Sequence, residues 1–248
     1  MSIKNLEQIL ENELNKIYKR ILAKKTVRIC IYTFFIIFYP GLVLAITIAE
    51  VYGPKGYNIF NNYISDLGSI RYTPAPFILD VLLICTSLLL IPIFLYLEQI
   101  LVSGPNLSKR FLNKSIFIKI LARIGKISFI LGSIGLLGAG IFNEDFSPFN
   151  IHLFTAILFF GGYFIGAFST GLIILLKKVI IPKAIGYIMV FNSSGIFILY
   201  AFIKVSFITY YFIEWCLFLS ILIWFIPITI IILRYQDKCI KKNKVINR

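Results

Sequence analysis

Six long apolar stretches constrain the fold of this chain more than any other feature. Each holds about 20 predominantly apolar residues, which is the length that a helix needs to cross roughly 30 Å of hydrocarbon. Lipid offers no partners for backbone N–H and C=O groups, and the alternating pattern of a barrel strand is absent, so these segments should be helices. The windows lie at about 30–49, 77–97, 124–142, 151–175, 184–203 and 212–233.

The composition agrees, because 59% hydrophobic residues in a chain of 248 exceed what a soluble domain of this length could bury. We therefore expect an all-α, polytopic integral membrane protein with six transmembrane helices over residues 29–235. Residues 1–28 should form a cytoplasmic amphipathic helix, and residues 236–248 a basic cytoplasmic tail. No cleavable signal peptide is expected, because the charged N-terminal segment leads into an apolar run of full spanning length.

The basic residues predict the orientation in the membrane. Of the 25 Lys and Arg residues, 22 fall in segments on one side, and only Lys55, Arg71 and Lys204 fall on the other. The positive-inside rule then places both termini in the cytoplasm and the protein in the cell membrane as a multi-pass protein. The formal net charge of +14 should serve this orientation and contact with anionic lipid headgroups at the cytoplasmic face. We expect no nucleic-acid partner, since no binding motif is present.

The N-terminal segment LEQILENELNKIYKRILAKK has helical periodicity, with acidic residues early and basic residues late. Such a helix should lie along the inner membrane surface. A helix that binds a protein partner is the alternative. Its apolar face would consist of Leu6, Ile9, Leu10, Leu14, Ile17, Tyr18, Ile21 and Leu22.

Two polar segments should lie on the outer side. The first is NNYISDLGS at 61–69, and the second is NEDFSPFN at 143–150. In the first, we expect Asp66 to accept hydrogen bonds from backbone N–H groups of its turn and Gly68 to adopt a positive φ. The two segments should converge into a polar cup.

The second segment joins two glycine-rich helices that should pack as a tight hairpin, through Gly135 with Ala139 and Gly162 with Gly166. Ser147 and Pro148 read as the N-cap and the first residue of the helix that follows.

Ionisable groups near the membrane surface are candidates for a functional site. Asp80 should lie nearly two turns into its helix, where Arg71 or His152 could pair with it. The predicted binding residues are Asn62, Ser65, Asp66, Gly68, Arg71, Asp80, Glu144, Asp145 and His152.

Catalytic and metal-binding residues are not assigned. Carboxylates and one imidazole can bind a cation or act as acid and base, but neither an HExxH nor a GxSxG motif is present. The four cysteines form no CxxC pair, so we expect no structural zinc site and no cofactor.

The segments NYISDLGS and GIFNEDFSPFNIHLF resemble two motifs of the membrane-protein family known as domain of unknown function 998. The resemblance covers about residues 30–233 and implies the same membrane fold. YISDLG is also similar, more faintly, to a motif of the damage-regulated autophagy modulator family, whose six-span members are linked to lipid organisation. The chain departs from the first pattern at Asn143, where a proline is expected, and at Asp80, where a neutral polar residue is expected.

These observations favour a protein that binds a lipid headgroup or a cation at its outer face, in a regulatory or lipid-organising role. One alternative is a membrane enzyme acting on a lipid or lipid-linked substrate. The other is an accessory subunit that binds a membrane-protein partner.

Overall fold

The structure is a computed structural model that describes residues 3–103, 116–202 and 209–246, and in these residues it is helical without strands. Five of the described helices are long and apolar enough to cross a membrane. The all-α membrane fold is therefore confirmed. These helices are α2 (Lys24–Tyr52), α3 (Phe77–Ser103), α5 (Ile116–Ile141), α6 (Ile151–Leu176) and α8 (Tyr210–Ile246).

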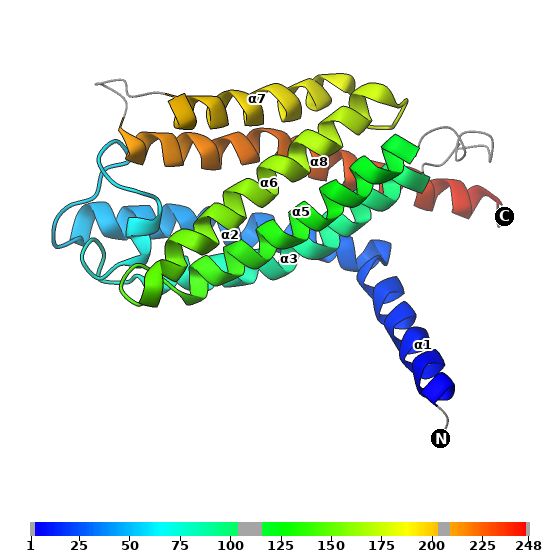
Figure 1. The fold of residues 1–248 in the computed structure, drawn as a ribbon, viewed down its shortest axis with the longest axis horizontal. Coiled ribbons are helices and arrows are strands. Elements are labelled where there is room, and N and C mark those ends of the chain that lie inside the picture. The colour runs from blue at the N-terminus through cyan, green and yellow to red at the C-terminus, as the bar shows by residue number, and fades with distance from the viewer. Residues whose placement is uncertain (1–2, 104–115, 203–208, 247–248) are drawn as a thin grey trace.

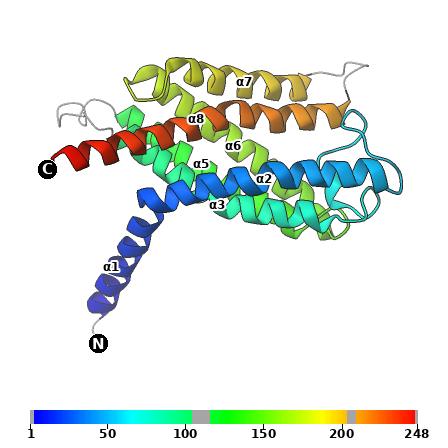
Figure 2. The ribbon, with the colours of Figure 1, turned by 180° about the vertical axis from the view of Figure 1, so that it is seen from behind.

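Two further helices complete the described architecture. Helix α7 (Lys183–Phe202) coincides closely with the predicted span at 184–203 and lies beside α8 in both views (Figures 1 and 2). Asn192 of α7 donates a hydrogen bond to the backbone oxygen of Ser220 in α8, at 3.3 Å. Helix α1 (Ile3–Ile21) projects away from the bundle, with the apolar side chains of Leu14 and Ile17 exposed.

The two ends of the bundle differ. The loops at 53–76 and 142–150 lie at one end, which we call the acidic end, and both chain termini lie toward the other (Figure 1). Near the second end, Arg28 pairs with Asp237 at 2.7 Å. Helix α8 continues to Ile246, through the segment that we expected to be a separate basic tail.

Helices α5 and α6 pack closely as the predicted hairpin, and glycines make this possible. A Cβ on Gly162 would lie 2.5 Å from the backbone nitrogen of Gly132, and one on Gly135 would meet the backbone nitrogen of Phe159. Only hydrogen atoms fit between the two backbones at these points.

The start of α6 differs from our expectation. Pro148–Asn150 forms a short 3₁₀ turn, and both Phe149 and Asn150 have a positive φ, near 53° and 58°. Ser147 therefore does not directly precede the α-helix, which begins at Ile151. Its Oγ still accepts the backbone N–H of His152, at 2.9 Å, so it satisfies one free donor of the first turn.

Aromatic side chains from several helices fill the middle of the bundle. Phe94 of α3 stacks on Phe129 of α5 with ring centroids 4.1 Å apart, and Phe34 of α2 meets Phe225 of α8 edge to face. By contrast, α8 meets α2 and α6 only locally, which leaves space between α8 and the other helices toward the acidic end.

Candidate functional site

The loop at 53–76 folds around the buried carboxylate of Asp66, which is 4% exposed. Its Oδ2 accepts the amide N–H of Asn62 and, as predicted, the backbone N–H of Tyr63, both at 3.0 Å. Burial raises the pKa of Asp66 to about 6, the nearby Glu144 carboxylate adds to this effect, and the two hydrogen bonds oppose it. The carboxylate therefore holds its own turn together.

The same loop is attached to α8 and to itself by buried groups. The indole N–H of Trp215 donates to the backbone oxygen of Asn62 at 3.2 Å. The hydroxyl of Tyr57 donates to the backbone oxygen of Tyr63 at 3.0 Å. Asn62 thus supports the loop through both its amide and its backbone. Asn62 therefore has a structural role in this loop.

Carboxylates of the second loop join the two loops. Ser65 Oγ donates to Glu144 at 2.8 Å. Asp145 accepts the hydroxyl of Ser69 at 2.7 Å and the backbone N–H of Ile70 at 2.6 Å. Segments about 75 residues apart in the chain therefore form one closed structure over the acidic end. We call these joined loops, 53–76 and 142–150, the lid.

Asp80 lies directly beneath the lid, in the first turn of α3 and not nearly two turns into it. Asn143 donates an amide N–H to its Oδ2 at 2.8 Å, so the two positions that depart from the first family pattern contact each other. A Cβ on Gly68 would lie 2.9 Å from Asp80 Oδ1. A side chain at this position would have to displace the Asp80 carboxylate, and the predicted positive φ is wrong, since among the described glycines only Gly56 has one.

The predicted pairing of Asp80 with Arg71 or His152 is also wrong. Within the described residues, no ion pair involves Asp80. The neutral amide of Asn143 takes that place and satisfies the carboxylate. The side chain of Arg71 is exposed, and among the described hydrogen bonds of the lid this residue takes part through its backbone N–H, which donates to the hydroxyl of Ser69.

His152 is the second residue of α6, and its ring has a defined hydrogen bond. Its Nδ1 lies 2.7 Å from the backbone oxygen of Phe142. Because a carbonyl oxygen can only accept, Nδ1 must carry the proton, and in the neutral ring Nε2 remains as an acceptor.

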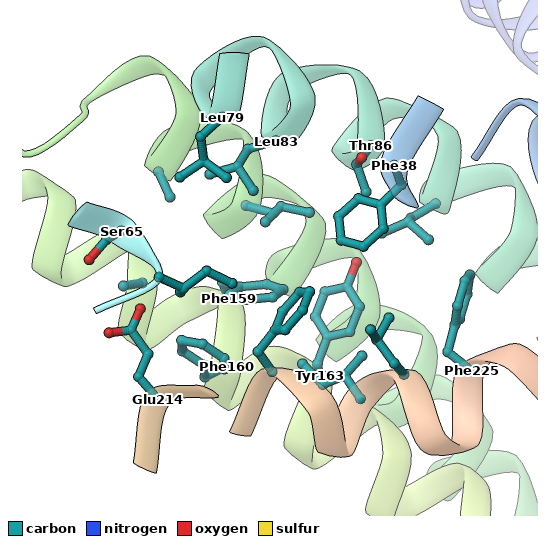
Figure 3. Close-up of a pocket in the computed structure, with 18 of the residues that line it drawn as sticks. Phe38, Ser65, Leu79, Leu83, Thr86, Phe159, Phe160, Tyr163, Glu214 and Phe225 are labelled. Carbon is teal, nitrogen blue, oxygen red and sulfur yellow. The ribbon is translucent and has the colours of Figure 1, made fainter. Parts of the chain in front are cut away.

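An elongated cavity extends from beneath the lid into the bundle, between α8 and the helices α2, α3, α5 and α6 (Figure 3). The empty space among its side chains, including the part that is open to the surroundings, amounts to about 760 Å³. Fifteen of its twenty lining residues are apolar, such as Phe38, Leu83 and Phe218. The expected polar cup is therefore not what the lid covers, because the loop carboxylates are engaged in joining the loops.

The five polar residues of the lining lie at two depths. Ser65, His152 and Glu214 lie at the acidic end, and Glu214 points its carboxylate toward the segment of Ser65 (Figure 3). Thr86 and Tyr163 lie deeper and point their hydroxyl groups into the cavity. Amphipathic ligands need this arrangement of a polar mouth and an apolar interior.

The two deep hydroxyl groups differ in their partners. Ser133 Oγ donates to the backbone oxygen of Phe129 at 2.9 Å, so its contact with Tyr163 at 3.2 Å must use the tyrosine proton. Thr86 is 2% exposed, and its Oγ1 has no hydrogen-bond partner in the described part of the chain. An unpaired buried hydroxyl is costly unless a ligand or water satisfies it.

The structure thus divides the predicted site residues into three groups. Ser65 and His152 line the cavity. The other lid residues, including Asp66, Glu144 and Asp145, hold the loops, while Asp80 supports the lid from below. The side chain of Arg71 takes no part in the described hydrogen bonds and ion pairs of this site. Sequence reasoning did not select Glu214 or Thr86. Asp80 was selected because an ionisable residue near the start of a membrane helix is a candidate for a functional site, and the same rule applies to Glu214 in α8.

No metal centre is apparent in the residues that the structure describes, because no three His, Cys, Asp or Glu side chains form a group that could hold an ion. Cys30, Cys85, Cys216 and Cys239 are free thiols.

No family model, curated protein or solved structure matches this chain. The resemblance to the two families therefore remains a prediction from the quoted motifs.

Proposed function

We propose that the protein binds a single-chain or slender amphipathic lipid in the cavity beneath the lid, in a regulatory or lipid-organising role. The observation that carries this proposal is the cavity itself, whose apolar interior adjoins a mouth with Ser65, His152 and Glu214. Burial of a hydrocarbon chain there would supply about 0.8 kcal/mol for each CH₂ group removed from water.

The proposed setting is a six-span protein of the cell membrane, with α7 as the sixth spanning helix and the acidic end outward. This orientation is supported by the 22 basic residues expected on the other side. It places the lid at the level of the outer headgroups. Helix α1, which ends with Lys19 and Arg20 in its last turn, would then rest on anionic lipids of the inner surface.

Mass spectrometry of lipids retained by the purified protein tests the proposal. Ala156 lines the cavity, whereas its neighbour Ile157 is 63% exposed on another face of α6. Ala156→Trp should fill the cavity and release the lipid, and the matched variant Ile157→Trp should retain it. The proposal is wrong if the wild-type protein carries no lipid, or if a folded Ala156→Trp protein carries as much.

A membrane enzyme acting on a lipid remains a second candidate because one observation favours it. The bond from His152 Nδ1 to Phe142 fixes the ring in the form whose Nε2 can act as a base. Ser65, however, donates its hydroxyl to Glu144 and not to His152. Turnover of a lipid substrate that is abolished by His152→Gln, in a protein that still folds, would favour this candidate.

A further inference from the structure

Side chains of the lid, including Ser65 at the mouth of the cavity, have their donors engaged by carboxylates. Ser65 donates to Glu144, Ser69 donates to Asp145, and Asn143 donates an amide N–H to Asp80. Each of these bonds uses a proton that could otherwise contact a ligand. The Ser65 hydroxyl therefore offers no free donor to a ligand at the mouth.

Two further polar groups, His152 and Glu214, line the mouth of the cavity. Nε2 of His152 remains free to accept, because Nδ1 donates to Phe142. Glu214 of α8 lines the same cavity, and its carboxyl group accepts the backbone N–H of Ser65. A ligand headgroup that reaches Nε2 of His152 therefore needs a hydrogen-bond donor to satisfy it.

The charges at this end favour the same kind of headgroup. The acidic residues Glu144 and Asp145 lie in the lid with Asp66. The basic side chains of Lys55 and Arg71 are exposed, and neither takes part in any of the described ion pairs. A phosphate or carboxylate at the mouth would meet like charges without a paired cation, which is unfavourable.

A second, independent feature indicates that the cavity is built for an occupant. The Thr86 hydroxyl is 2% exposed, lacks a partner in the described part of the chain, and points into the same cavity (Figure 3). A closed apolar contact would leave this group permanently unsatisfied. A ligand, or water that accompanies it, can provide the missing hydrogen bond.

We infer that the cavity selects a lipid whose headgroup donates hydrogen bonds through a hydroxyl or an amine, and that it rejects lipids with an anionic phosphate or carboxylate headgroup. This inference rests on the proposed function and adds the chemical class of the ligand. Hydroxyl and amine headgroups share the required property, since both present N–H or O–H donors without a negative charge.

Four probes with the same hexadecyl chain test the inference: hexadecan-1-ol, hexadecylamine, hexadecanoate and hexadecane. Equilibrium binding is measured on the full chain in lipid nanodiscs at neutral pH. Binding lost in Ala156→Trp is counted as binding in the cavity, and Ala139→Trp fills the same cavity from α5 if the first variant does not fold. The alcohol and the amine should each bind at least about tenfold more tightly than the carboxylate and the alkane.

The variant His152→Phe keeps an aromatic ring but removes the acceptor. It should reduce the advantage of hexadecan-1-ol over hexadecane by at least about fivefold, as expected for the loss of one hydrogen bond. The inference is overturned if hexadecanoate or hexadecane binds as tightly as the alcohol, or if His152→Phe leaves the advantage unchanged. If none of the four probes binds in the cavity, the proposed function itself fails.

Discussion

The contact between α5 and α6 gives the most quantitative prediction. An ideal Cβ on Gly162 would lie 2.5 Å from the nitrogen and 2.6 Å from the Cα of Gly132, and 2.6 Å from the backbone oxygen of Ser128. Ordinary van der Waals contact begins at 3.4 Å, so Gly162→Ala must separate the helices by about 0.9 Å at this point. Backbone atoms, unlike a flexible side chain, cannot move aside locally.

Gly161 provides a matched control, because a Cβ at this position would meet no atom within 4 Å. Both substitutions gain about 1 kcal/mol from the higher helix propensity of alanine. Their difference in stability therefore isolates the steric cost, which we expect to be about 2–3 kcal/mol. Gly161→Ala should be neutral or stabilising.

Reversible unfolding in mixed detergent micelles, followed by tryptophan fluorescence, measures this difference. Gly162→Ala should unfold at a lower denaturant fraction than wild type, and Gly161→Ala at an equal or higher one. Equal unfolding midpoints for the two variants would refute the close approach of α5 and α6.

Three further predictions concern the lid and the cavity. Asp145→Ala removes the shared acceptor of the Ser69 hydroxyl and the Ile70 N–H, and because water can replace it at this exposed site, the lid should lose about 1 kcal/mol, seen as faster hydrogen exchange at Ile70. Because the pKa of Asp66 is raised from 3.8 to about 6, protonation of its carboxyl group stabilises the folded loop, and this stabilisation is full below about pH 4 and lost as the pH rises through 6. Hydrogen exchange of the loop between pH 4 and 7 should show the loss of stability, and Asp66→Asn should remove the pH dependence. Thr86→Val should leave the empty protein equally or more stable but lower the amount of retained lipid, and unchanged retention would show that Thr86 does not contact the ligand.

The helices and their closest packing could be predicted from the sequence. Long apolar windows require helices in lipid, and small residues spaced by four on two adjoining helices predict a close hairpin, as Gly162 shows. The turn around Asp66 was also predictable, because an aspartate accepts nearby backbone N–H groups. Both predictions use residues of one turn or of two helices that follow each other in the chain.

The cavity and the contacts beneath the lid could not be predicted in the same way. The bond between Asn143 and Asp80 joins two helices' ends 63 residues apart, and the cavity depends on how α8 stands away from α2 and α6. The positive φ that we expected at Gly68 is absent, and its close approach to Asp80 is a tertiary contact. Spacing along the chain contains no information about such distances.

An experimental density map of the wild-type protein in lipid nanodiscs tests the central claim most directly. We predict elongated density that passes Thr86 and Tyr163 and ends in a headgroup between His152 and Glu214, beneath a lid joined by Asp145. A cavity collapsed around inward-turned aromatic side chains, with no density between α8 and the other helices, would contradict it.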